Sequence, residues 1–351
     1  CMGGQHTPVY PEVPGMESFA GEQWHSTYWN HAVDLRGKRM VVVGSAAAAV
    51  QVVPQVAEVA GQLTVLQRTP NWIMPRNWRR YPPRLKSLFH RFPAFLRLWR
   101  AGQGVMMGVV EQGVTLGHKR MDQFEARVHK FIEEAIDDPA VRAAVTPDSR
   151  YGCKRGLMSD EFYPTLNLEH VELVSEGLAE VRPAGIVTTG GREIDADVII
   201  YCTGYRIMDF DRIEVIGTNG RVLADVMAAE PMVFKGIAAP GFPNYFFGAG
   251  PNGLAINASY FANVECNLRT IVRLLAEKAQ SGVQAVVVKD ERNAAYNREL
   301  AGRFANYSWG AADCNSYYRT ASGHAPFLFP GAFKEYAKLH ASCSLDDFEA
   351  A

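Results

Sequence analysis

The stretch from Arg39 to Gln51 has residue types and a spacing that suit phosphate binding. Its apolar, β-branched run ends at Gly44 and passes into an alanine-rich stretch, which predicts a strand, a glycine turn and a helix of about fourteen residues. A dinucleotide-binding unit opens in this way, because the helix N-terminal amides receive a pyrophosphate. The usual pattern is G-x-G-x-x-G/A, and Ala46 replaces its second glycine. The extra methyl group weakens the pattern, and a βαβ turn without a ligand is the alternative.

The next strand indicates which dinucleotide such a unit would take. Residues 62–67 predict a second strand, and Arg68 and Thr69 follow it. An NAD-binding unit normally has an acidic residue here, which bonds the ribose 2′-hydroxyl. A cation and a hydroxyl suit a 2′-phosphate instead, so the sequence favours NADP over NAD. The alternative is an ordinary surface arginine at a strand end.

A second glycine pattern runs from Gly248 to Gly253. It follows an apolar run over 244–247, which predicts a strand, and it precedes a helix predicted from about 258 to 277. Pro251 removes one of the amides that such a loop would offer to a phosphate. We therefore interpret it as a helix-opening turn near a ligand and not as an independent dinucleotide fingerprint.

Composition limits the classes of protein that fit. The 351 residues include 36 Lys and Arg against 37 Asp and Glu, which argues against a nucleic-acid binder, and 48% are hydrophobic, which excludes wholesale disorder. The length suggests two domains, and no apolar run is long enough to span a membrane. The chain begins at Cys1 without a targeting segment, so we expect a piece of something longer.

The cysteines stand far apart and form no C-x-x-C pair. This spacing predicts reduced thiols, no metal site and a cytoplasmic location. The six are Cys1, Cys153, Cys202, Cys266, Cys314 and Cys343.

The order of predicted elements indicates an α/β fold with a mainly parallel sheet. Residues 1–30 show no sustained period and are interpreted as a connecting segment, and the region from about 76 to 148 is helical. Further strands are predicted at 171–174 and 197–203, and a hairpin at 185–194, where Gly190 and Gly191 suit a tight primed turn.

The segment 76–100 is strongly basic. No acidic residue stands between Glu58 and Glu111, and the basic residues are interleaved with Phe, Leu and Trp. Such a face can touch a membrane surface, but a solvated face over an adjoining domain is the favoured interpretation. The basic residues are Arg76, Arg79, Arg80, Arg84, Lys86, Arg91, Arg97 and Arg100.

Several motifs together resemble a known family. Phe19, Gly21, His25 and Trp29 match the fingerprint F-x-G-x-x-x-H-x-x-x-W of Baeyer–Villiger monooxygenases, which belong to the flavin-containing monooxygenase superfamily. That fingerprint continues with Pro or Asp, where this chain has Asn30. The other similar segments, in the family's order, are 34–39, 67–72, 152–155, 203–205, 240–244 and 250–252.

The resemblance implies a two-dinucleotide-binding-domain flavoprotein architecture. Residues 1–30 would be a linker and remnant of the FAD domain, 31–205 a Rossmann-like NADP domain with a helical insertion at about 76–148, and 206–351 the C-terminal part of the FAD and substrate domain. In the family an N-terminal segment with its own G-x-G-x-x-G binds the ADP part of FAD. We expect a fragment or a truncated relative that does not by itself retain stoichiometric FAD.

The resemblance also implies roles for individual residues. Arg155 resembles the active-site arginine between flavin and nicotinamide, and His25 would orient the nucleotide domain from the linker, a residue that a purely structural role explains equally well. Trp309 and Tyr317 belong either to the substrate side or to the core. The implied cofactor contacts are Gly44, Ser45, Ala46 and Ala49 for the NADPH pyrophosphate, Arg68, Thr69 and Lys154 for the 2′-phosphate, Thr203 and Gly204 at a further turn, and Gly250, Pro251 and Asn252 facing the isoalloxazine.

The implied activity is oxygen insertion next to the carbonyl of a small ketone or aldehyde. NADPH would reduce FAD, O₂ would add at flavin C4a, and the resulting peroxide would attack the carbonyl to give an ester or lactone. The alternatives are an N- or S-oxygenating flavin monooxygenase and a non-catalytic NADP-binding remnant. Trp29 and Arg155 favour the carbonyl chemistry.

Overall fold

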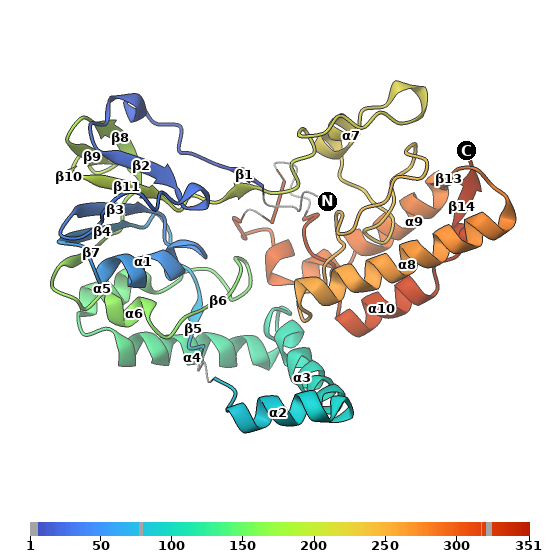
Figure 1. The fold of residues 1–351 in the computed structure, drawn as a ribbon, viewed down its shortest axis with the longest axis horizontal. Coiled ribbons are helices and arrows are strands. Elements are labelled where there is room, and N and C mark those ends of the chain that lie inside the picture. The colour runs from blue at the N-terminus through green and yellow to red at the C-terminus, as the bar shows by residue number, and fades with distance from the viewer. Residues whose placement is uncertain (1–5, 77–79, 317, 321–324) are drawn as a thin grey trace.

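The computed structural model describes residues 6–76, 80–316, 318–320 and 325–351. Cys1, Arg79 and Tyr317, which the sequence analysis named, lie outside them. Figure 1 shows two lobes, one built around a parallel sheet and the other around a long helix of the C-terminal half. A two-stranded antiparallel ribbon lies between the lobes, formed by β1 (Thr7–Pro8) and β12 (Tyr205–Arg206).

The first lobe holds a five-stranded sheet in the order β2-β11-β3-β4-β7, with every neighbouring pair parallel. Both faces of its central strands are buried, which is why their sequences are continuous apolar runs and do not alternate. This confirms the predicted α/β class with a parallel sheet. The strands are β2 (Glu22–His25), β3 (Arg39–Val43), β4 (Gln62–Leu66), β7 (Val171–Val174) and β11 (Val198–Tyr201).

Strand β2 lies within the segment that the sequence analysis treated as connecting. It forms the edge of the sheet, with His25 paired to Tyr201 of β11. A strand of four residues shows no measurable period. Its stability comes from burial of Trp24 and His25 and from pairing with a strand distant in sequence, so no local pattern predicts it. The domain limits given above stay predictions.

The helix after β3 is shorter than expected. Helix α1 runs from Ala49 to Ala57, nine residues rather than about fourteen, and the residues between Gly44 and Ala49 form turns. Pro54 lies inside this helix and leaves it without one backbone donor. A further short helix of this lobe is α6 (Phe162–Thr165).

An antiparallel sheet of three strands packs on the face of the parallel sheet opposite α1. The hairpin predicted at 185–194 is confirmed, but its turn is not a primed one. The amide of Gly191 donates to the carbonyl of Thr188, and only Gly191 has a positive φ, +84°, whereas a type I′ turn needs two such residues. The strands are β8 (Leu178–Arg182), β9 (Gly185–Thr188) and β10 (Glu193–Asp195).

The predicted helical region follows the second strand of the unit and is confirmed. It leaves the first lobe at β5 (Ile73–Met74) and returns at β6 (Leu157–Met158), which pair in parallel. Among the described residues, no helix is both long and apolar enough to cross a membrane. The helices are α2 (Pro83–Arg91), α3 (Pro93–Gly113), α4 (Lys119–Ala135) and α5 (Pro139–Val145).

The second lobe is mainly helical. Its long helix α8 runs from Tyr260 to Ser281, close to the predicted range, and Gly282 ends it in the left-handed conformation. The strand predicted at 244–247 is absent: the amides of Asn244 and Phe247 donate to the carbonyls of Val286 and Ile237, which lie in different segments, and form no ladder. The other elements are α7 (Leu223–Ala229), β13 (Val286–Val288), α9 (Asp290–Ala301), α10 (Phe333–Ala341) and β14 (Phe348–Ala350).

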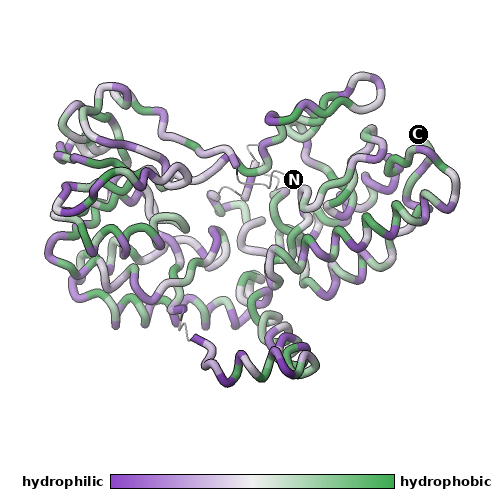
Figure 2. Tube along the Cα trace, viewed as in Figure 1, coloured by the Kyte–Doolittle hydropathy of each residue, from purple (hydrophilic) through white to green (hydrophobic). Residues whose placement is uncertain are grey.

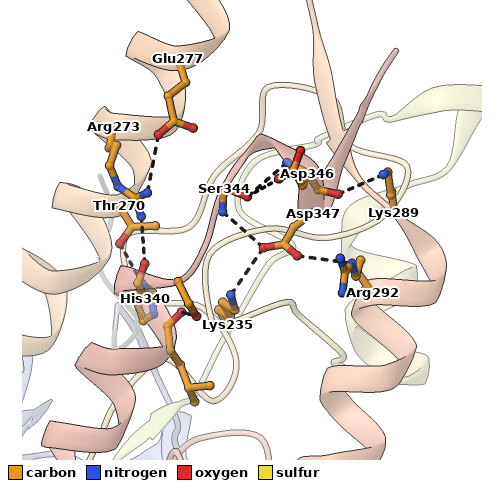
Figure 3. A network of polar contacts seen from close by, with 12 residues as sticks. Lys235, Thr270, Arg273, Glu277, Lys289, Arg292, His340, Ser344, Asp346 and Asp347 are labelled. Carbon is orange, nitrogen blue, oxygen red and sulfur yellow. Dashed lines mark hydrogen bonds and ion pairs between the residues drawn. The ribbon is translucent and has the colours of Figure 1, made fainter.

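A polar network ties the C-terminus to this lobe. Figure 3 shows the Asp347 carboxylate between two cations, with Lys235 Nζ at 3.5 Å and Arg292 Nε at 3.4 Å. On α10 the His340 ring lies 3.1 Å from Thr270 Oγ1 of α8 and is almost fully buried. Burial lowers the pKa of His340 to about 4, so the ring is neutral at physiological pH.

Two of the cysteines are joined. Cys153 and Cys314 form a disulfide, with Cα atoms 5.5 Å apart, so the prediction of reduced thiols is wrong for this pair. The residues are 161 positions apart, and only the tertiary fold brings them together, which is why spacing gave no sign of the bond. Among the described residues the free thiols are Cys202, Cys266 and Cys343.

The lowered pKa of His340 makes stability depend on pH. Between its ordinary value of 6.5 and about 4 the unfolded chain binds a proton that the folded one does not, so stability is present above pH 6.5 and is lost as pH falls. We expect the difference in unfolding free energy between the wild type and His340→Gln to change by about 3 kcal/mol across that window. Denaturant titrations at pH 7 and pH 4 measure it, and a constant difference would contradict the assignment.

The disulfide should stabilise the fold through the unfolded state. Opening it with Cys314→Ser is expected to lower the unfolding free energy by about 2–4 kcal/mol, because the unfolded chain regains the freedom of a long loop. The effect should vanish when both proteins are unfolded in the presence of a strong reductant. A variant equally destabilised with and without reductant would show that lost packing, not lost cross-linking, is the cause.

Candidate functional site

Most of the predicted site residues of the first lobe lie at one edge of its sheet. Parallel strands end at the same edge, so the residues that follow β2, β3, β4 and β11 gather there. His25 is the last residue of β2, Gly44 follows β3, Arg68 follows β4 and Thr203 follows β11. Ligands of open α/β sheets bind at this carboxyl edge.

The Gly44 turn has the geometry of a phosphate cradle. Gly44 has φ +109°, and a Cβ there would lie 2.7 Å from the carbonyl oxygen of Cys202, so no larger residue fits. Helix α1 has no side-chain cap, and the amides of residues 45–49 donate to no other group in the described part of the chain. Several unpaired amides at a helix N-terminus form a site for an anion.

Hydrogen bonds join this turn to the one that follows β4. The buried Ser45 hydroxyl donates to the carbonyl of Thr69 at 3.4 Å, and the Asn71 side-chain amide donates to the carbonyl of Ser45 at 3.3 Å. The structure therefore brings Ser45 and Thr69, two of the predicted cofactor contacts, next to each other. Asn71, which the sequence analysis did not single out, fixes the spacing of the two turns.

Lys154 joins the same site from a distant part of the chain. Burial lowers the pKa of its amine, the carboxylate of Asp148 raises it, and the positive charge of Arg68 lowers it again. Lys154 and Arg68 are thus close enough to repel each other, although they are 86 positions apart in sequence. Two neighbouring cations with one carboxylate nearby leave net positive charge for a bound anion.

The loop that carries Lys154 and Arg155 is held from three sides. Gly152 has φ +88°, and a Cβ there would lie 2.5 Å from the side chain of Val114 and 2.6 Å from that of Ser308. The next residue, Cys153, is bonded to Cys314 of the second lobe. Arg155 itself is exposed and forms no hydrogen bond or ion pair with another described residue.

The surroundings of His25 suit a structural role. It is fully buried, its Nδ1 accepts the amide of Thr27 at 3.2 Å, and its Nε2–H donates to the carbonyl of Gly204 at 3.1 Å. Burial lowers its pKa, and the bond to Gly204 partly offsets this, so the ring is a neutral link between β2 and the turn after β11. The amide of Val9 donates to the same carbonyl at 2.9 Å. These contacts suit a hinge between the lobes.

The rest of the fingerprint is also structural. Phe19 packs into the core on one face of the sheet, and a Cβ on Gly21 would lie 2.4 Å from the carbonyl oxygen of Asp197. Trp29 packs edge-on against Trp24 of β2, with ring centroids 5.8 Å apart. The motif therefore fixes β2 against the sheet and positions His25.

Gly250, Pro251 and Asn252 lie in the second lobe, in a tightly constrained turn. A Cβ on Gly250 would lie 2.8 Å from the carbonyl oxygen of Gly236, and the Asn252 amide group donates to the carbonyls of Ala325 and Leu328. Asn252 Oδ1 is buried and has no partner among the described residues. Helix α8 begins only at Tyr260, so this turn does not open it, and the helix N-terminus is capped by the side chain of Ser259.

Two residues missed by the sequence analysis support this turn. Asn267 of α8 donates to the carbonyl of Gly248 at 2.9 Å, and the Tyr336 hydroxyl donates to the carbonyl of Gly253 and lies 2.6 Å from Asn267 Oδ1. Both are buried. An Asn and a Tyr on the buried faces of these amphipathic helices were the available signal, but nothing in the sequence indicates their target.

Trp309 belongs to the core: it is fully buried and stacks on Tyr307 at 4.5 Å between ring centroids. A cavity of about 340 Å³ lies beside the β1–β12 ribbon, and none of the predicted site residues that the structure describes lines it. Among the residues that line it are Tyr205, Arg206, Asp209, Tyr318 and Arg319.

The comparisons with known proteins fit this arrangement. A family model described as flavin-binding monooxygenase-like matches residues 1–217. A Baeyer–Villiger monooxygenase of Pseudomonas aeruginosa is 36% identical over 94% of this chain and 63% of its own length. A Baeyer–Villiger monooxygenase of Streptomyces coelicolor is 34% identical over 99% of this chain and 68% of its own length. The chain thus spans less than two thirds of the first relative and slightly more of the second.

A solved structure agrees with the architecture. The crystal structure of OTEMO in complex with FAD and NADP superposes with a TM-score of 0.86 at 25% identity, covering 99% of this chain and 74% of that one. This confirms the two-dinucleotide-binding-domain architecture. Since the family model matches more than half of the chain and a 34% identical relative is covered over 68% of its length, the chain belongs to the flavin-binding monooxygenase-like family and is similar to its Baeyer–Villiger members.

Proposed function

We propose that this protein is an NADPH- and FAD-dependent monooxygenase that inserts one oxygen atom of O₂ next to the carbonyl of a small ketone or aldehyde, forming an ester or lactone. The observation that carries the proposal is the grouping of unpaired amides after Gly44 with Arg68 and Lys154, next to the exposed Arg155. The names of the two relatives and the FAD and NADP bound by OTEMO support it.

The first lobe fits NADPH. The Gly44 cradle suits a pyrophosphate, because amides of Ser45 to Ala49 can donate to its oxygens. Ala46 does not rule this out, because the donors are backbone amides and alanine has one as glycine does. Arg68 and Thr69 follow β4 and Lys154 lies near Arg68, so a 2′-phosphate bound between them would relieve the repulsion between the two cations.

The second lobe fits part of FAD. The turn at 250–252 leaves no space for a side chain at Gly250 and holds a buried side-chain oxygen, Asn252 Oδ1, that has no partner among the described residues. A hydrogen-bond donor on a bound flavin would satisfy it. When bound, FAD supplies the activation of O₂ with electrons taken from NADPH.

Arg155 is suited to stabilise negative charge that develops on the substrate. A guanidinium stays protonated at any physiological pH, and no described carboxylate neutralises this one. A fixed cation stabilises the oxyanion that forms on the carbonyl oxygen when the substrate is attacked. The Gly152 packing and the Cys153–Cys314 bond hold its backbone in place.

The cytoplasmic location inferred from cysteine spacing stays a prediction. The disulfide between Cys153 and Cys314 removes part of its support, because such bonds are rare in reducing compartments.

The cofactor preference should depend on the cation pair. Arg68→Ala or Lys154→Ala is expected to weaken NADPH binding by tens of fold, since a charge-assisted hydrogen bond is worth about 1.5–3 kcal/mol, and to leave NADH binding nearly unchanged. Titration of each variant with both dinucleotides measures this, and Arg127→Ala on the exposed face of α4 is the matched control. Equal affinity of the unmodified protein for the two dinucleotides would refute the assignment.

Arg155 should control oxygen insertion but not NADPH oxidation. In the FAD-loaded enzyme, Arg155→Ala is expected to lower ester formation by about 10²–10³-fold while NADPH is still consumed and hydrogen peroxide is released. Arg155→Lys keeps the charge but loses the planar fork, and should restore little activity. The measurement is ester formed per NADPH oxidised. A ratio near that of the unmodified enzyme would exclude Arg155 from the chemistry.

A further inference from the structure

Helices α2 and α3 form a hairpin that lies outside the body of the first lobe. Figure 1 shows them at the lower edge of the molecule, beyond α4. No described residue from Arg80 to Met107 is buried. The hairpin is attached at the C-terminal end of α3, where Gly113 and Val114 are buried.

The hairpin exposes large apolar side chains to an unusual degree. On α3, Leu98 is 70% exposed, Val105 81% and Met106 65%. Figure 2 shows apolar and polar residues intermixed along both helices. Apolar surface that is gathered in one place on a folded protein usually marks an interaction site.

Aromatic rings give the hairpin its own internal contact. Phe89 of α2 stacks on Phe95 of α3 with centroids 5.7 Å apart and meets Trp99 at the same distance. Tyr81 packs edge-on against Phe89 at 5.9 Å. These contacts hold the two helices together, while Leu98, Val105 and Met106 remain outside the cluster.

Up to residue 110 the Asp, Glu, Lys and Arg side chains of the hairpin all have one sign. Residues 76–100 hold eight basic side chains, and no acidic residue occurs between Glu58 and Glu111. Five of the basic residues are exposed and form no ion pair in the described part of the chain: Arg84, Lys86, Arg91, Arg97 and Arg100.

Helix α8 also exposes apolar side chains, but its arginines differ from those of the hairpin in being paired with carboxylates. It bears Val272, which is 64% exposed, but its arginines are paired: Arg269 with Glu265 and Arg273 with Glu277. Apolar exposure combined with unpaired positive charge is thus a property of the α2–α3 hairpin.

We propose that the α2–α3 hairpin docks on an anionic lipid surface. At 100° per residue, Leu98, Val105 and Met106 project from one side of α3, and Arg97 and Arg100 from the other. A helix of this kind lies in the membrane interface, with its apolar face among the acyl chains and its cations near lipid phosphates. Sequence analysis favoured a solvated face over an adjoining domain, but the exposed side chains include large apolar ones as well as the cations.

A second copy of the chain fits this surface less well. A second hairpin would bring no negative charge, because it carries the same five cations and no carboxylate up to Glu111, so the cations of both copies would stay unpaired and repel each other. Lipid phosphates supply the missing negative charge.

The test is sedimentation of the full protein with vesicles of phosphatidylcholine alone or mixed with phosphatidylglycerol. We expect binding to the mixed vesicles only, weakened by added salt. Each basic residue near an anionic surface is worth about a factor of five, so the double variant Arg97→Glu, Arg100→Glu should weaken binding by at least about 25-fold. Leu98→Asp should weaken it by about tenfold.

Matched variants at exposed positions elsewhere are the controls. Val272→Asp on α8 and the double variant Arg127→Glu, Arg298→Glu on α4 and α9 should bind the mixed vesicles like the unmodified protein. Equal binding by Leu98→Asp and the unmodified protein, or no binding to either vesicle, would overturn the proposal. So would a dimer in sedimentation velocity that Leu98→Asp dissociates in the absence of vesicle binding, because the face would then join two copies.

Discussion

The parallel pairing of β2, β11, β3 and β4 decides where the candidate residues of the first lobe can lie. Because these strands end at one edge, a histidine, two glycine turns and an arginine from distant parts of the chain become neighbours there. The pairing also explains the glycine at position 44: the chain leaves β3 against the carbonyl of Cys202, the residue after the adjacent strand β11, and this leaves no space for a side chain. The glycine turn is therefore a consequence of the sheet.

The loop at 151–156 belongs to both lobes. Gly152 fits between Val114 of the helical insertion and Ser308 of the second lobe, and Cys153 is bonded to Cys314. Lys154 reaches back toward Arg68, and Arg155 points to no described partner. One short segment thus connects the turn that carries Arg68 with the region where the two lobes meet. His25 makes a second, neutral connection through the carbonyl of Gly204.

Local patterns predicted part of this arrangement well. The strand, glycine turn and second strand at 39–69 could be predicted because strands buried on both faces have continuous apolar sequences. The hairpin at 185–194 could be predicted because its turn is rich in glycine. The edge strand at 22–25, the Cys153–Cys314 bond and the proximity of Lys154 to Arg68 depend on contacts between distant residues and leave no local period. The support of Gly248 and Gly253 by Asn267 and Tyr336 was missed for the same reason. The comparisons confirm the family, while the individual site assignments stay predictions.

The bond between Cys153 and Cys314 also changes the connectivity of the molecule. It closes the backbone between these residues into a covalent ring that contains β7, the three-stranded sheet, α7, α8 and α9. A single cut in that ring, for example by a protease in the long irregular stretch before α8, leaves both fragments attached. The nicked protein would keep the mass of an intact chain on a non-reducing gel and separate into two bands only after reduction. The lobes can therefore tolerate backbone cleavage there without drifting apart.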